Sequence, residues 1–556
     1  MKRFKFAIIV LALSVITGIG VISAQAPDDT LLLRAGGDIT TFNPPFVVDA
    51  GSGAATGLIW PTLYETDPMT GLPVPGLTSW EISEDGLTYT FTMLEGVAWS
   101  DGTPMTAEDA VFTIGAYLSE ELGSPQGGQL RASGATVELI DDLTFSVTFG
   151  EVSCTALQSM GGVRVLPAHR FEADYSDFTT NSINTDPDIS GGPYILEEWR
   201  PDEFSRYSAN PNYWAGEPQI PFVVYRVIED NSVVIQALLA GELDYMVLPG
   251  NDLEQLEAAG VFQINPLTSN NAGFFAMNWA NPDNPQAALD VDGNYVEQDV
   301  HPIFGDIMVR QAVSMGYDKD AIVASSPGAT RIHTSINPAF DWATNPDLEL
   351  RSYDPEAAMS MLDEAGWTMN ADTGIRECNG CTTAEDGTPM AFELVYSDFF
   401  GYFETAAIVI EDQLSQLGMD VSLQRMEWGA YLSEAFLAQQ FDATVISFGA
   451  GNDPGGIANT IMHSRNDQPG GGFNATSFSN PEFDDLADQA NSIPGCAIED
   501  RAPLYYRMQE IEYEQVAYDF FLSPTLYTVA SPRIANFGAG PFGQIGSYWT
   551  ELTLDN

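Results

Sequence analysis

The residues best suited to redox or metal chemistry in this 556-residue chain are its four cysteines, Cys154, Cys378, Cys381 and Cys496. The run Cys378-Asn-Gly-Cys381 places a turn dipeptide between two thiols, which favours a local disulfide and leaves Cys154 and Cys496 as the remaining pair. Spacing does not fix the connectivity, because four cysteines allow three pairings. A zinc-binding or redox CxxC is the alternative, but the chain has no second CxxC and no histidine nearby.

No motif for catalysis or for a bound cofactor stands out. The chain lacks a Gly-x-Ser-x-Gly elbow, a phosphate loop and a dinucleotide fingerprint. Its four histidines do not have the i, i+4 spacing of a metal-binding helix, and the glycine-rich run 449–456 contains no lysine. Paired carboxylates prove nothing about glycoside hydrolysis in so acidic a chain. We therefore expect no enzyme, no cofactor and no metal site.

The N-terminus has the pattern of a secretory leader. Three basic residues precede an apolar segment, and Ala24 and Ala26 offer cleavage sites. We expect residues 1–26 to be a signal peptide, with a retained signal anchor as the alternative. No other run approaches the ~20 apolar residues that cross a bilayer. The expected location is periplasmic, secreted or on the surface of a bacterial or archaeal cell, with no membrane insertion after the leader is cleaved.

Acidic residues dominate the composition. The formal net charge is −58, and it becomes −61 without the three basic residues of the leader. Nucleic acid and anionic membrane surfaces demand basic patches, so the charge disfavours both as partners, and we expect no nucleic acid ligand. A solvated acidic shell explains the charge without any ligand; selection for a cationic ligand is the alternative.

The apolar pattern predicts an α/β protein with mixed sheets. Short β patterns occur at 31–34, 88–93, 144–149, 222–227, 392–396 and 443–448. An amphipathic helix is expected over 404–417, because Ala407, Ile410 and Leu414 fall on one face. Thr106 and Asp109 form a capping box that opens another helix. At this length the chain should form more than one domain.

An ordered series of motifs spans nearly the whole mature chain. It begins with residues 77–112, which combine Asp-Gly turns, an alternating strand and the capping box. It continues with Gly191-Gly-Pro-Tyr194, Asn210-Pro-Asn-Tyr-Trp214 and the stretches 237–244, 309–318, 353–358, 362–367, 413–423 and 441–442. This series resembles the extracytoplasmic solute-binding proteins of ABC importers, family 5, the oligopeptide, dipeptide and nickel group.

The resemblance implies the two-lobe periplasmic-binding-protein type II fold with an extra inserted domain, the cluster C arrangement. It implies a first lobe of residues 27–70, 189–272 and 521–556, an extra domain of 71–188 and a second lobe of 273–520. Such a protein closes on a ligand that contacts both lobes. The family then implies delivery to the transmembrane subunits of an ABC permease, and we expect a monomer.

The resemblance also implies which residues line the cleft. These are Asp49, Ala50 and Ser52 in the first lobe, and Trp428, Tyr431, Phe448, Gly449, Ala450, Asn452 and Asp453 in the second. For Trp428 the alternative is a packed core aromatic. Peptide-binding members carry an Asp three residues before the Asp-Pro of this loop, where it pairs with the α-amino group of the peptide. Here that position is Ala450, with Asp49 or Asp453 as substitutes.

The leading function is a non-catalytic importer component that captures peptides or another polar oligomer such as an oligosaccharide. The missing Asp shifts weight toward saccharides, whose ring faces stack on aromatic side chains. A secreted hydrolase and a ligand sensor that signals through a membrane partner are the alternatives from other classes. Turnover of candidate ligands would reveal the hydrolase, and gene neighbourhood would separate the sensor from the importer component.

Overall fold

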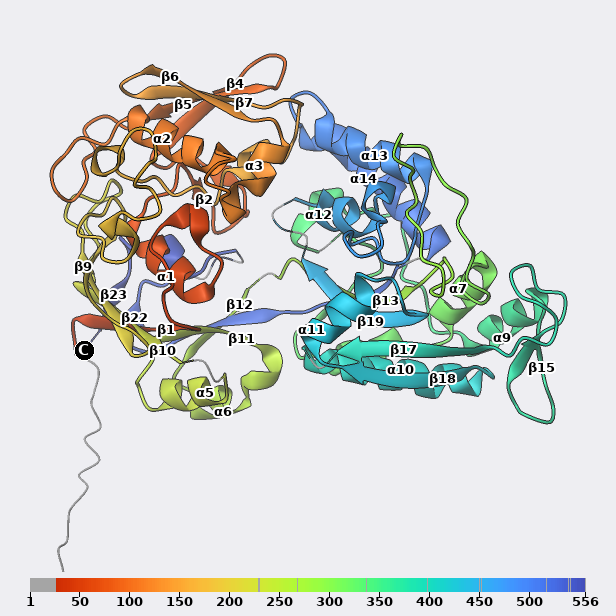
Figure 1. Cartoon of the computed structure of the whole chain (residues 1–556). Helices are drawn as coiled ribbons and strands as arrows, with labels where there is room; N and C mark the ends of the chain where they lie inside the picture. The colour runs from red at the N-terminus through yellow and green to blue at the C-terminus, as the bar shows by residue number, and fades with distance from the viewer. Residues whose placement is uncertain are drawn as a thin grey trace, which may run out of the picture.

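The chain folds into two lobes that lie side by side (Figure 1). The computed structural model describes residues 27–228, 231–267, 269–336, 338–397, 399–449, 451, 453–516, 518–538, 540 and 542–555. The expected leader, residues 1–26, lies outside the described residues, as do the two cleft residues Ala450 and Asn452. In the described part of the chain, no helix combines the length and the apolar character that crossing a bilayer requires.

A seven-stranded sheet forms the base of the first lobe. In spatial order its strands are β12 (Gln263–Leu267), β21 (Leu526–Ala530), β11 (Tyr245–Pro249), β1 (Thr30–Ala35), β10 (Phe222–Val227), β9 (Phe204–Ala209) and β8 (Tyr194–Arg200). β1 runs parallel to β10 and β11, and nearly all of its residues are buried. A parallel strand covered on both faces requires the continuous apolar run that residues 31–33 supply.

Helices and short elements complete the first lobe. The helices are α1 (Ala50–Ile59), α5 (Asn231–Leu239) and α6 (Glu254–Ala259), and the short strands are β2 (Glu65–Thr66), β3 (Pro73–Val74), β22 (Ile534–Ala535) and β23 (Thr553–Leu554). Asp49 is the N-cap of α1, and its side chain accepts the backbone N–H of Ser52.

A four-stranded antiparallel sheet with helices lies at one end of this lobe. Its order is β4 (Thr78–Ile82), β5 (Thr88–Met93), β7 (Thr144–Thr148) and β6 (Thr136–Asp141), and its helices are α2 (Ala107–Leu118), α3 (Gly128–Ala132) and α4 (Ala156–Ser159). The capping box predicted for α2 is present, with the N–H of Thr106 donating to Asp109 at 2.9 Å. Gly86, in the predicted turn between β4 and β5, has a φ of 74°, which favours glycine.

The second lobe is built on a six-stranded sheet. Its order is β14 (Thr330–Arg331), β20 (Tyr518–Ser523), β13 (Asn271–Met277), β19 (Ala443–Gly449), β17 (Ala391–Ser397) and β18 (Asp420–Met426). β17 is parallel to both β18 and β19, so these three strands end at the same edge. In Figure 1 that edge faces the first lobe.

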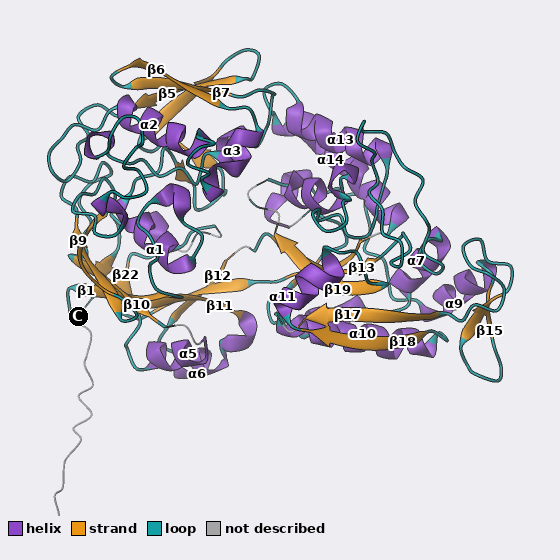
Figure 2. Ribbon diagram, in the orientation of Figure 1, coloured by secondary structure: helices purple, strands orange, loops and turns teal. Residues whose placement is uncertain are grey.

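Helices cover this second sheet. They are α7 (Ile307–Met315), α8 (Lys319–Ala324), α9 (Pro355–Glu364), α10 (Gly401–Gln416), α11 (Trp428–Ala430), α12 (Gly455–Ile457), α13 (Pro481–Ser492) and α14 (Ile498–Gln515), and β15 (Trp367–Met369) pairs with β16 (Arg376–Cys378). α10 packs against β17 and β18 (Figure 2). The predicted stripe of Ala407, Ile410 and Leu414 is buried. The helix begins three residues before the expected start at Glu404.

The lobes are joined by two chain crossings. One lies between Leu267 and Asn271, and the other lies between Ser523 and Leu526. The boundaries expected at 272/273 and 520/521 fall inside β13 and β20, because both strands are continuous buried segments. Each lobe has its own large hydrophobic core, and among the described residues the two cores share no member.

Candidate functional site

The loop before α1 carries the first-lobe residues expected in the cleft. Asp49 accepts the N–H of Ser52 at 2.7 Å and the hydroxyl of Thr40 at 2.6 Å. Partial burial alone would raise the pKa of Asp49, but these hydrogen bonds outweigh it and hold the pKa below its usual value. Ala50 is exposed, whereas Ser52 is buried, and its hydroxyl accepts the N–H of Thr40. Ala50 therefore faces solvent, Asp49 is half-buried against Thr40 and Ser52, and the Ser52 hydroxyl anchors the loop to Thr40.

A cavity of about 340 Å³ lies beside α1 and contains an arginine that sequence reasoning missed. It is lined by Gly53, Ala54, Gly57, Leu58, Trp60, Pro61, Thr62, Glu65, Arg164, Pro193, Tyr213, Tyr225, Gln544, Ile545, Gly546, Ser547 and Trp549. An added Cβ at Gly57 would lie 3.4 Å from Nη2 of Arg164, so the glycine leaves room for the guanidinium. Arg164 also donates to the carbonyl of Trp60 at 3.4 Å.

The surroundings of Arg164 leave its charge only partly compensated. Burial lowers the pKa of this guanidinium, and Tyr117, Glu65 and Tyr225 oppose that effect. Burial raises the pKa of Glu65, with Arg164 pulling it back down. It also raises the pKa of Tyr225 to about 12, so this phenol is neutral at ordinary pH. One carboxyl that resists ionisation therefore faces an obligate cation, an arrangement that can accept an anionic ligand group.

The sequence contains a signal that could have pointed to this arginine. Arg164 stands between Val163 and Val165 in an apolar run, and it is one of only 17 basic side chains left after residue 26. A charged residue in such a run is seldom buried without a partner or a role. The motif series has no landmark at this position.

Aromatic side chains gather where the parallel strands of the second lobe end. Trp428, directly after β18, is half-buried and stacks on Phe399 with ring centroids 4.4 Å apart and an interplanar angle of 23°. Phe399 follows β17 and is 52 % exposed, and its neighbour Phe400 is 37 % exposed. Ligands of α/β folds commonly bind beyond the carboxyl ends of parallel strands. Phe399 and Phe400 were not expected from the sequence.

The remaining second-lobe candidates divide into exposed and buried groups. Tyr431 is buried beneath Trp428, with its hydroxyl 2.7 Å from that of Thr444. Phe448 is half-buried and contacts Phe473, which is 42 % exposed, and Gly449 is exposed.

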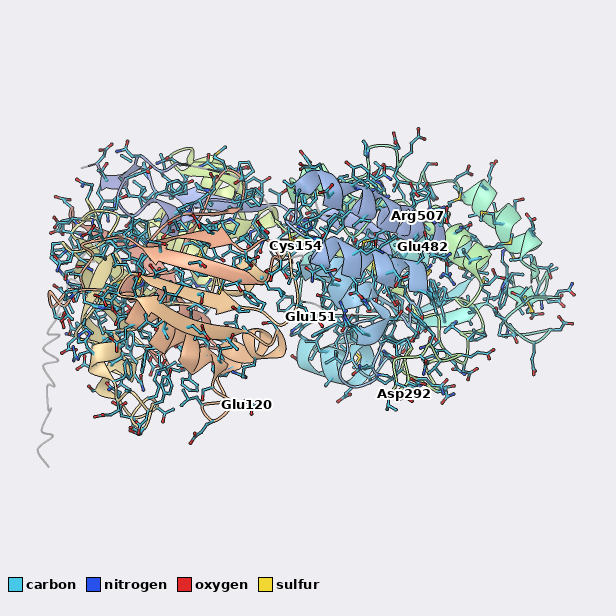
Figure 3. All side chains as sticks on the ribbon, turned by 90° about the horizontal axis from the view of Figure 1, so that it is seen from above. Glu120, Glu151, Cys154, Asp292, Glu482 and Arg507 are labelled. Carbon is cyan, nitrogen blue, oxygen red and sulfur yellow. A yellow bond between two sulfur atoms is a disulfide. The ribbon has the colours of Figure 1, made fainter. Side chains whose placement is uncertain are left out.

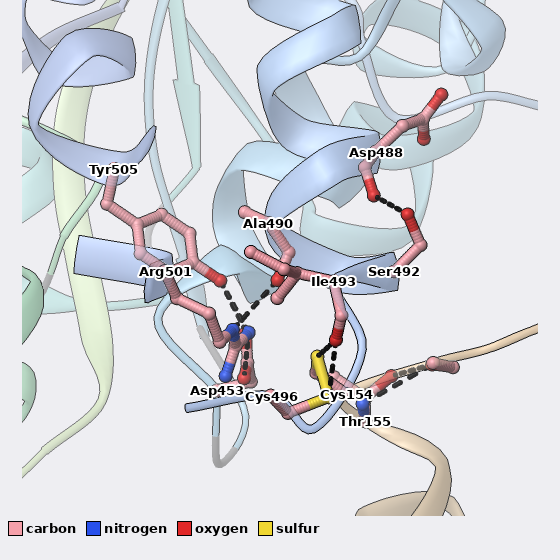
Figure 4. The surroundings of a disulfide bond; sticks show 11 residues. Cys154, Thr155, Asp453, Asp488, Ala490, Ser492, Ile493, Cys496, Arg501 and Tyr505 are labelled. Carbon is pink, nitrogen blue, oxygen red and sulfur yellow. Dashed lines mark hydrogen bonds and ion pairs between the residues drawn. A yellow bond between two sulfur atoms is a disulfide. The ribbon is translucent and has the colours of Figure 1, made fainter. Parts of the chain in front are cut away.

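Asp453, a suggested substitute anchor for an amine, has a different environment. Its carboxylate is buried and accepts a hydrogen bond from Arg501 at 2.7 Å and another from the Tyr505 hydroxyl at 3.2 Å (Figure 4). The charge of Asp453 is therefore neutralised by Arg501 inside the second lobe. Ala450, the position of the absent anchor, lies outside the described residues.

The cysteines form two pairs in the structure, Cys154 with Cys496 and Cys378 with Cys381. Neither pair leaves a thiol for catalysis or for metal binding. Within the described ranges, no group of three or more histidine, cysteine or acidic side chains is arranged to hold a metal ion.

Comparison with known proteins relates the chain to a family of binding proteins. Residues 73–469 match the family model of the bacterial extracellular solute-binding proteins, family 5, middle region. The oligopeptide-binding protein AppA of Bacillus subtilis is 25 % identical over 497 residues, with 88 % of this chain and 84 % of the relative covered. The dipeptide-binding protein of Escherichia coli is 24 % identical, with 97 % of both chains covered.

Solved structures share the fold. The structure of AppA from Bacillus subtilis in complex with a nonapeptide has a TM-score of 0.68 at 22 % identity and covers 95 % of this chain and 99 % of that one. NikZ from Campylobacter jejuni, in complex with Ni(L-His), has a TM-score of 0.72 at 22 % identity and covers 95 % and 100 %. These likenesses confirm the predicted two-lobe type II binding-protein fold.

Proposed function

Because the chain belongs to the bacterial extracellular solute-binding proteins of family 5, we propose that it captures peptides for an ABC importer and carries no catalytic activity. Its ligand would lie between the lobes, with its carboxylate at Arg164 and an apolar or aromatic side chain on the Trp428–Phe399 stack. The peptide would then pass to the transmembrane subunits of a permease. Cleavage of residues 1–26 and a monomeric state belong to the same proposal.

The observation that carries the proposal is the pairing of two unlike surfaces. In Figure 1, α1 and the carboxyl ends of β17 and β19 point toward the boundary between the lobes. The first side offers a guanidinium in a cavity of about 340 Å³, and the second offers exposed aromatic rings. A ligand that contacts both sides favours the closed state by its differential affinity.

An oligosaccharide remains the second candidate. Its ring faces would stack on Phe399 and Trp428, and its hydroxyls would bond to polar side chains. A neutral sugar, however, would add no negative charge at Arg164 beyond that of Glu65, whose pKa burial raises. The half-buried and only partly compensated arginine therefore favours a ligand with a carboxylate.

Native mass spectrometry of freshly purified protein, followed by calorimetry, tests the proposal. We expect co-purified peptides, and we expect the tripeptide Ala-Phe-Ala to bind at least tenfold more tightly than its C-terminal amide. Binding of maltotriose without binding of either tripeptide would establish the saccharide alternative. Release of cleaved products during incubation would show a hydrolase, and normal binding without any effect of a permease on uptake would favour the sensor.

A further inference from the structure

The Cys154–Cys496 disulfide joins the two lobes at a point remote from the hinge. Cys154 lies in the segment between β7 and α4. Phe149, which follows β7, and Ala156, which opens α4, both belong to the core of the first lobe. Cys496 lies in the loop between α13 and α14, two helices whose buried residues belong to the core of the second lobe. The bond therefore connects two separately packed bodies across 342 residues of sequence.

The contact around this disulfide is close and specific. The backbone N–H of Cys154 donates to the carbonyl of Asn491 at 2.6 Å, which adds a second link between the lobes. Cys154 is 8 % exposed, and Cys496 is half-buried at the surface of its loop. Figure 3 shows Cys154 where the two lobes meet.

The loop that carries Cys496 is also linked to the cleft. Arg501, one turn into α14, donates to the carbonyl of Ala490 at 2.8 Å and to Asp453 at 2.7 Å. Asp453 in turn accepts the N–H of Gly455, the first residue of α12, at 2.8 Å. Arg501 therefore connects the end of α13 and the start of α14 with Asp453, in the segment that follows β19.

The position of the disulfide opposes hinge motion. The two chain crossings lie beside β12 and β13, whereas the β7 and α13 ends meet at the top of the inter-lobe boundary in Figure 1. Rotation about the crossings separates the points farthest from them the most. An intact disulfide confines its two Cα atoms, here 5.4 Å apart, to within about 7 Å of one another.

We propose that the Cys154–Cys496 disulfide is a latch that limits the separation of the lobes and slows ligand exchange at the cleft. This inference rests on the proposed function for its effect on ligand, but not for its effect on lobe motion. A dithiol releases the latch by thiolate attack on Sγ of Cys496, which forms a mixed disulfide and expels Cys154 as a thiolate that takes up a proton. The second thiol of the reductant closes its own disulfide and leaves Cys496 as a thiol.

The test compares two double variants with the wild-type protein. C154S/C496S removes the latch, and the matched control C378S/C381S removes the disulfide that lies within the second lobe. Thiol titration of the unfolded, unreduced wild-type protein should find no free thiol; four thiols would overturn the latch. Circular dichroism establishes that each variant is folded, and dithiothreitol treatment of the wild type provides a second route if C154S/C496S does not fold.

Lobe motion is measured without any ligand. Nitroxide labels attached through non-natural amino acids at Glu120 and Asp292, exposed residues on different lobes (Figure 3), report the distance between the lobes by pulsed electron resonance. We expect one narrow distribution for the wild type and C378S/C381S, and a broader distribution at longer distances for C154S/C496S and the reduced wild type. Identical distributions in all samples would overturn the latch.

Ligand exchange is measured separately with Ala-Phe-Ala as the probe. Release should be at least tenfold faster from C154S/C496S than from the wild type and unchanged in C378S/C381S. Failure of every variant to bind this tripeptide would count against the proposed peptide function, whereas the label distances would still decide the latch.

Discussion

The two lobes offer a ligand opposite kinds of surface. The first-lobe side is a polar cavity in which Arg164 faces Glu65 and neutral tyrosines. The second-lobe side is an aromatic cluster at the ends of three parallel strands, centred on Phe399 and Trp428. A charged contact in a cavity discriminates between chemical groups, while aromatic area binds many side chains. The difference suggests that the first lobe recognises the carboxylate end of a ligand, while the second lobe binds apolar side chains of many kinds.

The largest expected effect comes from removing the charge of the first lobe. Arg164→Ala should weaken binding of Ala-Phe-Ala by about 1.5–3 kcal/mol, because it deletes a charge-assisted hydrogen bond in a desolvated site. The affinity of Arg164→Lys should lie between those of the wild type and Arg164→Ala, since a lysine keeps the positive charge but lacks the planar guanidinium. Calorimetry measures the affinities. Arg200→Ala, at an arginine 56 % exposed on β8, is the control and should bind normally; equal affinity in all four proteins would exclude a carboxylate site at Arg164.

The second-lobe side should respond by a similar or smaller amount. Trp428→Ala should lower affinity by about 1–3 kcal/mol and leave the fold intact, because the ring is half-buried and stacks on an exposed phenylalanine. Trp428→Phe, which retains a ring, should recover most of the loss. A Trp428→Ala protein that melts far lower yet binds normally would show that the ring serves only the core.

A pH titration tests the first-lobe side, where the Glu65 carboxyl group interacts with Arg164. Burial raises the pKa of Glu65, so this group takes up a proton at a higher pH than an exposed glutamate does. Ionised Glu65 competes with a ligand carboxylate for Arg164, and protonation removes that competition while the ligand, with a pKa of about 3.3–3.7, stays charged. Affinity for Ala-Phe-Ala should therefore rise severalfold as the pH falls from about 8 to about 5.

Glu65→Gln provides the control for this titration. The variant should bind more tightly than the wild type at neutral pH and should lose most of the pH dependence. Trp428→Ala should keep the wild-type pH dependence at a lower affinity. Binding that weakens as the pH falls would contradict the assigned competition between Glu65 and the ligand.

The sequence predicted the regular elements well, whereas the surroundings of the candidate site residues emerged only from the fold. The strands at 88–93 and 222–227 have the predicted bounds. An alternating or continuous run of apolar residues is a local signal of a strand and can be recognised without knowledge of distant contacts. Arg164 and Phe399 were missed because their setting depends on contacts with distant segments, such as Trp60 and Trp428. The environment of Asp453 also depends on a distant contact. Its carboxylate pairs with Arg501 of α14, a helix that begins 45 residues later, and the local sequence does not reveal this pair.

The smallest effect is expected at the amino end of a peptide ligand. Asp453 is buried against Arg501, and Asp49 already accepts hydrogen bonds from Ser52 and Thr40. Asp49 is also only half-buried, and a charge pair that remains open to solvent contributes about 0–1 kcal/mol. N-acetylation of Ala-Phe-Ala should therefore change the affinity by less than tenfold, equivalent to about 1.4 kcal/mol. Calorimetry with the free and acetylated tripeptides at fixed salt decides this point, and Asp49→Asn should bind both alike. A loss of tenfold or more on acetylation, abolished by Asp49→Asn, would show that the first lobe reads the amine as well as the carboxylate and would end the division of roles between the lobes.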